Sequence, residues 1–309
     1  MPRTEPATAA PENPPRAPQP EPPARLVAER FHLGDLTLTA ALGPANGPPL
    51  LLIHGVTRCW QDWSPLLPEL TRHWRVIALD LRGHGASERS NHGEYLIRNF
   101  ADDAVRFLHL LGDEPVAVFG HSLGAMVAAV VAAHAPRRVR ALVLEDPPGT
   151  TLAERVSESP FHLQFSGIQR LLTTPRSVDD LTLALADLPV RRPGDGAVVK
   201  FSEMRDLAAL RFSAECLLKM DPRVLAPLLA GRWLEGLDWF AELPRIACPT
   251  LLLRADPALG GMLGATEAGR VTAVIPHCTR VDLPGIGHNI HATQPQQTLE
   301  LVNPFLNSL

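Results

Sequence analysis

The 309-residue sequence has few cysteines, and they do not form a disulfide or zinc framework. The thiols lie far apart, at Cys59, Cys216, Cys248 and Cys278, and none belongs to a C-x-x-C pair. Such spacing is typical of reduced thiols in the cytosol, so we expect a cytoplasmic protein. A long apolar run is also missing. The longest uncharged one, Ala125–Ala133, is far below the roughly 20 residues that a membrane span requires.

Charge of one sign is not in large excess, because 29 Lys and Arg residues face 33 Asp and Glu residues. The net charge of −4 gives no reason to expect nucleic acid or an anionic membrane as a partner. Metal and nucleotide motifs are missing as well. The histidines form no H-E-x-x-H, and no G-x-G-x-x-G opens the first predicted helix. We therefore expect no metal, no cofactor and a small-molecule substrate.

The N-terminus is rich in proline and has no apolar core of the kind that a signal peptide contains. Nine of its first 24 residues are proline. Proline has no N–H to donate, and the segment has little apolar surface to bury. We predict that residues 1–24 form a disordered tail.

After this tail, short apolar runs alternate with helical patterns. The segment Leu36–Leu42 alternates as a half-buried edge strand does. Near-continuous apolar runs, each ended by Gly, Asp or Pro, are typical of strands buried on both faces, and they lie at Pro49–Gly55, Arg75–Gly83, Pro115–Ser122, Arg140–Pro147 and Pro249–Asp256. The alternation predicts the α/β class, with a doubly wound and mostly parallel sheet.

The alternation stops between residues 150 and 243, where the patterns are helical and "RRPGDG" (191–196) is a Pro/Gly break. We predict a helical cap over 150–243, inserted between two parts of an α/β core, 25–149 and 244–309. The last segment, 291–309, is predicted to close the chain as a helix that Pro304 ends or bends.

A serine fenced by two glycines stands where an apolar strand pattern meets a long apolar helix pattern, in "VAVFGHSLGAMVAAVVAA" (116–133). Gly-x-Ser-x-Gly alone is a weak signal, but the strand-to-helix context is that of a nucleophile elbow. In such a turn, side chains at Gly120 and Gly124 would collide with their neighbours. The hydroxyl of Ser122 would then project from the sheet edge above a helix N-terminus, which favours developing negative charge.

Four segments in this order resemble the α/β-hydrolase family: "LLIHGVTRCWQDW" (51–63), "VIALDLRGHGAS" (76–87), "GHSLGAM" (120–126) and "VDLPGIGHNIH" (281–291). The resemblance covers about residue 27 to the C-terminus and is weakest over 150–243. It implies Ser122 as nucleophile and His288 as general base and acid. It also implies an oxyanion hole made by the backbone N–H groups of Val56 and Leu123.

The acid of the implied triad departs from the family pattern. The family usually places it after the strand that follows the cap, where this chain has Asp256, about two residues early. A minority of relatives place it at the end of the preceding strand, where this chain has Asp146. We expect Asp256, with Asp146 as the alternative, because Pro147 and Pro148 stiffen the chain after Asp146.

Other histidines and charges near these motifs have structural interpretations. We expect His291 to pack or to line the entrance, and His54 to brace the loop that carries Val56. The charged residues of "DLRGHG", Asp80, Arg82 and His84, are expected to hold their loop close to the elbow.

The resemblance implies a metal-free serine hydrolase that cleaves small to medium carboxylic esters through an acyl-enzyme. Serine at the elbow disfavours epoxide hydrolase and haloalkane dehalogenase chemistry, which needs a carboxylate nucleophile. Alternatives on the same triad are hydrolysis of a carbon–carbon bond in a β-diketone and cofactor-free perhydrolase activity. A non-catalytic ligand receptor is another. Cap residues that either line an apolar pocket or pack on the core are Phe161, Phe165, Met204, Phe212, Trp233 and Trp239.

Overall fold

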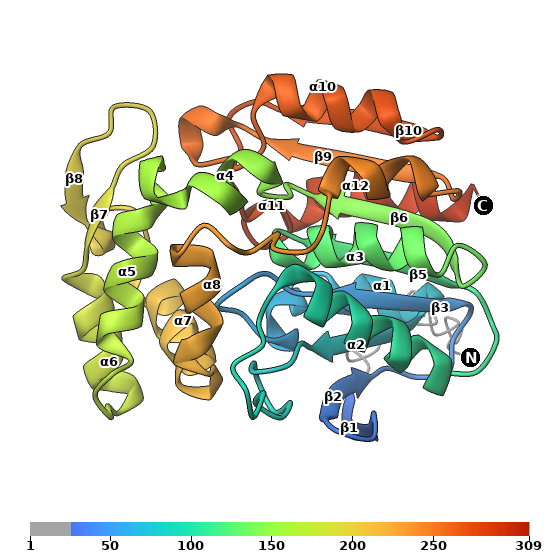
Figure 1. The fold of residues 1–309 in the computed structure, drawn as a ribbon, viewed down its shortest axis with the longest axis horizontal. Coiled ribbons are helices and arrows are strands. Elements are labelled where there is room, and N and C mark those ends of the chain that lie inside the picture. Colours follow the sequence, from blue (N-terminus) through green and yellow to red (C-terminus); the bar gives the residue numbers. More distant parts are fainter. Residues whose placement is uncertain (1–25, 309) are drawn as a thin grey trace, which may run out of the picture.

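An eight-stranded sheet runs through the centre of the computed structural model, which describes residues 26–308 (Figure 1). In spatial order the strands are β1 (Val27–His32), β2 (Thr37–Leu42), β4 (Arg75–Asp80), β3 (Pro49–Ile53), β5 (Val116–His121), β6 (Val139–Glu145), β9 (Thr250–Ala255) and β10 (Cys278–Leu283). Strand β2 pairs antiparallel with both neighbours, and all other pairs are parallel. The predicted doubly wound, mostly parallel α/β sheet is confirmed. The predicted tail, residues 1–24, lies outside the described residues.

The edges of the sheet differ from the prediction. Strand β1 pairs outside β2, so the segment expected to be an edge strand is the second strand of the sheet. Most side chains of β1 are exposed, so this strand has no apolar run from which it could be predicted. Strand β10 forms the other edge of the sheet. Several of its side chains are also exposed, and its sequence mixes polar with apolar residues.

Helices cover both faces of the sheet. Helices α2 (Ile97–Leu110), α3 (Leu123–His134) and α10 (Ala265–Val274) bury their apolar side chains against one face. Helices α1 (Leu67–His73) and α12 (Pro295–Asn307) do so against the other, and α11 (Ile290–Thr293) precedes α12. Pro304 lies inside α12, which continues past it to Asn307, so of the two expected effects of this proline the helix end is wrong, and the bend stays a prediction. No helix that the structure describes is long and apolar enough to cross a membrane.

Helix α3 is buried from Leu123 to Ala133, which explains its uninterrupted apolar sequence. It packs behind β5 and β6 and also contacts α2. The helix begins at Leu123, directly after Ser122. Because the helix is buried over its length, it fixes the position of that serine.

The segment between β6 and β9, residues 149–245, is called the insert. Its helices are α4 (Gly149–Arg155), α5 (Phe161–Leu171), α6 (Val178–Ala186), α7 (Leu207–Lys219), α8 (Leu225–Leu229) and α9 (Trp239–Glu242). Figure 1 shows α5 to α8 grouped beside one end of the sheet. The insert is not wholly helical as predicted, because β7 (Pro189–Arg191) and β8 (Val198–Lys200) form a small hairpin. The Pro/Gly break at 191–196 supplies its turn.

Short 3-10 helices connect several of these elements. They are η1 (Trp60–Trp63), η2 (Val156–Glu158), η3 (Phe201–Glu203), η4 (Pro222–Val224), η5 (Leu243–Arg245) and η6 (Pro257–Leu259).

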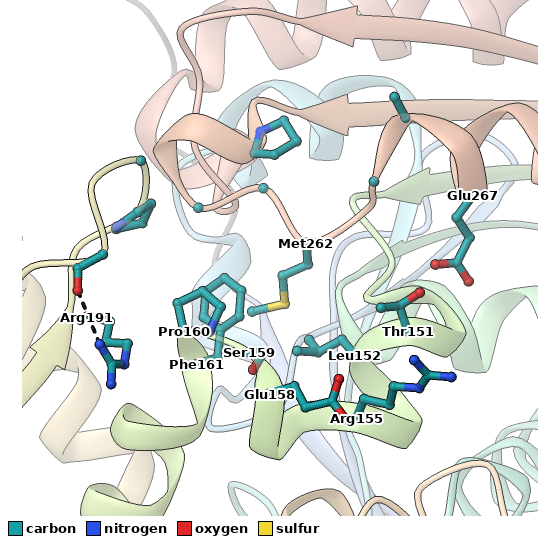
Figure 2. A pocket seen from close by; sticks show the side chains of 18 of the residues that line it. Thr151, Leu152, Arg155, Glu158, Ser159, Pro160, Phe161, Arg191, Met262 and Glu267 are labelled. Carbon is teal, nitrogen blue, oxygen red and sulfur yellow. Dashed lines mark hydrogen bonds between the residues drawn. The ribbon is translucent and has the colours of Figure 1, made fainter.

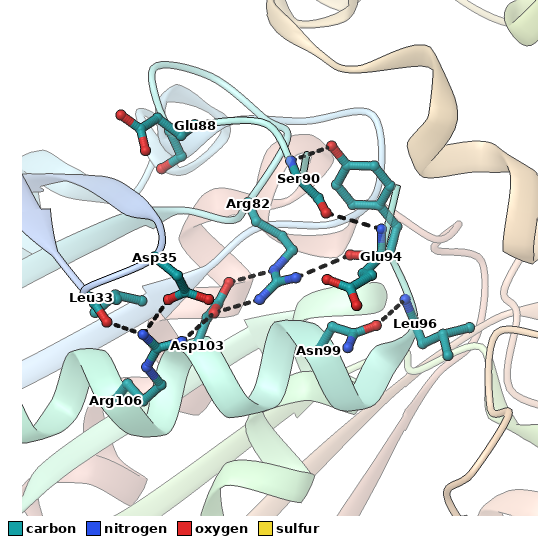
Figure 3. Close-up of polar contacts among 12 residues, drawn as sticks. Leu33, Asp35, Arg82, Glu88, Ser90, Glu94, Leu96, Asn99, Asp103 and Arg106 are labelled. Atoms are coloured by element: carbon teal, nitrogen blue, oxygen red, sulfur yellow. Dashed lines mark hydrogen bonds and ion pairs between the residues drawn. The ribbon is translucent and has the colours of Figure 1, made fainter. Parts of the chain in front are cut away.

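A buried ion pair holds the loop after β4 to helix α2 (Figure 3). The Nε and Nη2 atoms of Arg82 donate to the two carboxylate oxygens of Asp103, each at 2.6 Å. A third donor of the same guanidinium reaches the carbonyl oxygen of Glu94 at 3.2 Å. Arg106 on the same helix contacts Asp35 and thereby ties in the turn between β1 and β2. This bidentate geometry gives Arg82 the structural role expected from the sequence.

Asp80, the last residue of β4, and His84, in the loop that follows, also make internal contacts. Asp80 accepts hydrogen bonds from the backbone N–H groups of Trp60 at 2.7 Å and Ala86 at 2.9 Å. His84 is fully buried, and its Nδ1 donates to the carbonyl oxygen of Arg82 at 2.9 Å. The loops after β3 and β4 are therefore joined at the edge of the sheet where Ser122 emerges.

Candidate active site

The turn from β5 into α3 holds Ser122 in a conformation that few residues adopt. Its φ of 55° and ψ of −119° lie outside the helical and extended regions, at a cost of about 1–3 kcal/mol. Its N–H donates to the carbonyl oxygen of Glu145 at 2.9 Å. The flanking glycines are sterically required. A Cβ on Gly120 would lie 2.2 Å from the carbonyl oxygen of Gly124, and a Cβ on Gly124 would lie 2.0 Å from that of Ile53.

The loop after β3 passes directly beside this serine. A Cβ on Gly55 would lie 2.9 Å from Nδ1 of His121 and 3.2 Å from the Cβ of Ser122, so a larger residue would require these neighbours to shift. The next residue, Val56, lines the same cavity as Ser122. Among the described residues, the backbone N–H groups of Val56 and Leu123 donate to no acceptor. Neither N–H group therefore has a backbone acceptor in this part of the chain, which is one condition for an oxyanion hole.

His54 braces this loop, as expected from the sequence. Its Nδ1 donates to the carbonyl oxygen of Gly55 at 2.8 Å, and its Nε2 accepts from the N–H of Leu81 at 3.1 Å. Both ring nitrogens are therefore occupied in the neutral form. Burial lowers the pKa of His54, which keeps it neutral and out of proton transfer.

His288 pairs with Asp146. Its Nδ1 donates to Oδ2 of Asp146 at 2.6 Å, a short charge-assisted hydrogen bond. The same carboxylate accepts from the backbone N–H groups of Met262 at 2.8 Å and, at longer distance, Ala255 and Leu263. The ring of His288 lines the cavity that contains Ser122. With Nδ1 committed to the carboxylate, Nε2 is the nitrogen left for proton transfer.

The expectation that Asp256 pairs with His288 is corrected by these contacts. Asp256 begins η6, and its carboxylate accepts from the backbone N–H groups of Ala258 and Gly285, both at 2.9 Å. These two bonds lower its pKa. The sheet order gives the reason for the difference. Strand β6, which ends before Asp146, lies directly beside β5, whereas β9, which leads to Asp256, is one strand further away.

A buried charged cluster lies beneath the elbow. His291 is fully buried, and its Nδ1 donates to Glu145 at 2.9 Å while its Nε2 lies 3.4 Å from Oδ2 of Asp62. Although burial opposes the charged form, the carboxylates of Glu145 and Asp62 raise the pKa of His291 to about 10. The neighbouring His121 has its pKa lowered to about 3 by burial, and its Nε2 donates to the carbonyl oxygen of His288 at 3.2 Å. His291 therefore packs and does not line the entrance.

Three atoms of this cluster face one another without hydrogen-bond partners among the described residues: Oδ2 of Asp62, Nδ1 of His121 and Nε2 of His291. They lie within 4.8 Å of one another, close enough to hold a metal ion. A metal would have to displace the proton from His291, because a ligating imidazole must be neutral. The raised pKa of His291 opposes that exchange.

The cavity above Ser122 has a volume of about 260 Å³ and lies between the core and the insert. Of the insert residues expected to line a pocket or to pack, Phe161, Phe165 and Met204 line this cavity. The other three have packing roles. Trp233 and Trp239 are buried in the core cluster, and the ring of Phe212 lies 5.8 Å from the guanidinium carbon of Arg58.

A larger cavity of about 1000 Å³ adjoins the first one and shares Phe161, Pro193, Gly260 and Met262 with it. Figure 2 shows Met262 reaching down toward Phe161 and Pro160. Charges of both signs line the larger cavity, and its Glu267 is held by the hydroxyl of Thr150 at 2.7 Å. The two cavities therefore adjoin one another along these four shared residues.

The comparisons with known proteins agree with this fold. The model of the alpha/beta hydrolase fold family matches residues 48–295, and the chain belongs to that family. A 2-(acetamidomethylene)succinate hydrolase of Mesorhizobium japonicum is 25% identical over 289 residues, 92% of this chain and 96% of that protein. A 2-hydroxymuconate semialdehyde hydrolase of Pseudomonas sp. is 38% identical over 108 residues, 34% of this chain and 38% of that protein. The crystal structure of a deformylase from Pseudomonas putida S16 has a TM-score of 0.71 at 19% identity, with 89% and 100% of the two chains covered. Membership of this family supports a hydrolase activity for the chain.

Proposed function

We propose that the chain hydrolyses small to medium carboxylic esters through an acyl-enzyme on Ser122, with His288 as general base and acid and Asp146 as the acid of the triad. One observation carries the proposal. His288, which pairs with the buried Asp146 at 2.6 Å, lines the cavity that also contains Ser122 on its strained turn. A serine hydroxyl, an imidazole with one nitrogen committed to a carboxylate, and two unengaged N–H groups are what acyl transfer requires.

In the proposed reaction, the hydroxyl oxygen of Ser122 attacks the ester carbonyl carbon while Nε2 of His288 takes the hydroxyl proton. The carbonyl oxygen becomes an oxyanion that accepts hydrogen bonds from the N–H groups of Val56 and Leu123. The bond to the alcohol oxygen then breaks, and the imidazolium returns its proton to the leaving alcohol. Water repeats the sequence on the acyl-enzyme and releases the acid, which restores Ser122.

A series of p-nitrophenyl esters of increasing acyl length, combined with fluorophosphonate labelling, tests this proposal. Ser122→Ala is expected to remain folded, to lose labelling and to lose several orders of magnitude in kcat. Ser64→Ala is the matched control, because its hydroxyl only bonds the carbonyl oxygen of Gln61 on the surface. Labelling that persists in Ser122→Ala would assign the nucleophile to another residue.

Carbon–carbon bond hydrolysis is the second candidate. One relative is named for a hydroxymuconate semialdehyde, a compound with neither an ester nor an amide bond to hydrolyse. A β-diketone substrate separates the candidates, since its cleavage gives a ketone and an acid in place of an alcohol and an acid. Faster turnover of the diketone than of any ester in the series would favour this second reaction.

A further inference from the structure

Two guanidinium groups line the cavity above Ser122, and they differ in how they are paired. Arg58 donates to the hydroxyl of Ser213 at 2.8 Å, and its Nε lies 3.6 Å from Oδ1 of Asp62. The guanidinium of Arg205, by contrast, makes no hydrogen bond or ion pair with any residue between 26 and 308. This second side chain therefore has no ion-pair partner among these residues, and of the acids only Asp62 and Asp206 act on it, at longer range.

The nearest acids are already committed to other groups. Asp206, the next residue along the chain, turns its carboxylate to the N-terminus of α7 and accepts from the N–H of Ala209 at 2.7 Å. Asp62 faces Arg58 and His291. Burial, followed by the nearby charge of Arg58, lowers the pKa of Arg205 to about 10, so the side chain still carries its charge at neutral pH. A partly buried cation without a counter-ion is costly unless a ligand supplies one.

The surroundings of Arg205 favour a small anion over a bulky one. The cavity of about 260 Å³ has to hold the scissile ester as well as the anion. Apolar side chains of Phe201, Met204 and Leu217 line the same cavity and limit the water that can solvate a charge there. One unpaired guanidinium matches a singly charged carboxylate, whose two oxygens fit the planar fork of the guanidinium.

We propose that Arg205 binds a carboxylate carried by the acyl part of the substrate, so that the preferred substrates are short monoesters of dicarboxylic acids. This inference rests on the proposed ester hydrolysis at Ser122 and narrows its substrate class. Arg58 adds positive potential to the cavity, but its pairing with Asp62 and Ser213 leaves the bidentate role to Arg205.

A matched pair of esters tests the inference: mono-p-nitrophenyl glutarate, which carries one negative charge, and its methyl ester, which is neutral. The wild type is expected to have a kcat/KM at least about tenfold higher for the charged ester. Arg205→Gln should lower kcat/KM for the charged ester about 10- to 100-fold, mainly through KM, and leave the neutral ester within about twofold. Arg205→Lys should recover part of the loss, since a lysine keeps the charge without the planar fork.

Arg232→Gln is the control variant, because this exposed arginine of the insert pairs with Glu235 on the surface and lies outside the cavity. It should leave the ratio of the two esters unchanged. An equal loss for both esters in Arg205→Gln would show a structural role for Arg205 and overturn the proposal. So would a wild type that does not distinguish the two esters.

A binding measurement separates this inference from the proposed activity. Glutarate should raise the Tm of the wild type and not that of Arg205→Gln. If neither ester is cleaved and Ser122 is not labelled, the proposed ester hydrolysis fails, yet a glutarate shift that depends on Arg205 would still support a carboxylate site. No shift in either protein would overturn the carboxylate site itself.

Discussion

The backbone at the end of β6 directs a carboxylate toward His288. Asp146 has a φ of 42°, a value that residues other than glycine rarely adopt. Its N–H donates to the carbonyl oxygen of Leu253, which fixes the turn, and its Oδ2 accepts from both His288 and Met262. Strain of this kind persists where the surrounding hydrogen bonds impose it, and it is common at functional sites.

Replacement of this carboxylate should abolish most of the activity. Asp146→Asn is expected to lower kcat about 10⁴-fold, because an amide can present its N–H and favour the wrong tautomer of His288. Asp256→Asn should change kcat by no more than about threefold, because Asp256 binds Ala258 and Gly285 and not His288, although the single amide oxygen keeps only one of these two hydrogen bonds. Kinetics with p-nitrophenyl esters, with circular dichroism to confirm folding, measure both. The reverse order of the two losses would restore Asp256 as the acid.

The buried His291 should make stability depend on pH. Its folded-state pKa of about 10 lies above the ordinary value of 6.5, so its pairing with Glu145 and Asp62 stabilises the protein fully below about pH 6.5. This stabilisation is lost as the pH rises through 10. Glu145 and Asp62 have lowered pKa values, and His121 is neutral, so none of these neighbours titrates between pH 6 and 10.

His291→Gln is therefore expected to cost about 3–5 kcal/mol near pH 6, as loss of one partner from a buried ion pair does. The difference from the wild type should shrink between pH 7 and 10. Urea unfolding at pH 6, 8 and 10 measures it. His134→Gln is the control, because that histidine pairs with Glu242 near the surface. A difference that stays constant over this range would mean that His291 is neutral in the folded state.

At the scale of elements, the contact of β5, α3 and β3 leaves no space for a side chain at Gly124. Gly124→Ala places a Cβ 2.0 Å from the carbonyl oxygen of Ile53, a backbone atom that cannot move aside as a flexible side chain could. We expect a loss of more than about 2 kcal/mol in unfolding free energy and loss of esterase activity. Gly269→Ala is the matched control in α10, where nothing lies within 4 Å of the added Cβ. It should stabilise by about 0.5–1 kcal/mol, as measured by urea unfolding. Equal stability of both variants would contradict the close packing at the elbow.

The elements that have a local sequence pattern could be predicted from the sequence. The acid of the triad could not, because its identity depends on which strands are neighbours in the sheet. The central strands and the turn at Ser122 follow from apolar runs and glycine spacing. The hairpin β7–β8 has strands of three residues each, too short for a period to show. Asp146 and Asp256 both follow apolar strands, and only the order of β5, β6 and β9 shows that Asp146 is nearer.

The buried partners of His291 could not be predicted either, because they come from distant parts of the sequence. Glu145 and Asp62 come from β6 and η1, far from His291 in sequence. A carboxylate at a strand end next to Asp146 was visible in the sequence, but nothing local indicated that it would face an imidazolium. Charge compensation between distant elements becomes evident only when the sheet is assembled.

At the scale of the whole molecule, the insert is joined to the core by buried polar contacts as well as by apolar packing. The backbone N–H of Asp221, in the insert, donates to the carbonyl oxygen of Gly83 in the loop after β4 at 2.8 Å. Two thiols also meet across this boundary, with the sulfur atoms of Cys59 and Cys216 3.1 Å apart. These contacts fix the wall that α7 contributes to the cavity, so the stability of the boundary bears on substrate binding.

Tyr95 is a core side chain that joins the insert by a buried hydrogen bond, and Tyr95→Phe tests the boundary. Its hydroxyl donates to Oδ2 of Asp221 at 2.7 Å and accepts from the N–H of Ser90 at 2.9 Å. Phenylalanine preserves the packing but leaves two buried groups short of a partner, at a cost of about 1–3 kcal/mol. We expect a lower Tm and faster proteolysis within the insert, whereas Thr173→Ala, at an exposed hydroxyl of the insert, should change neither.

Because Tyr95 is the sole tyrosine of the chain, its ionisation can be followed by absorbance. Burial and the carboxylate of Asp221 raise the pKa of Tyr95 above its usual value of 10, so tyrosinate should appear only beyond that pH. Ordinary titration near pH 10, together with an unchanged Tm in Tyr95→Phe, would show that this contact does not hold the insert to the core.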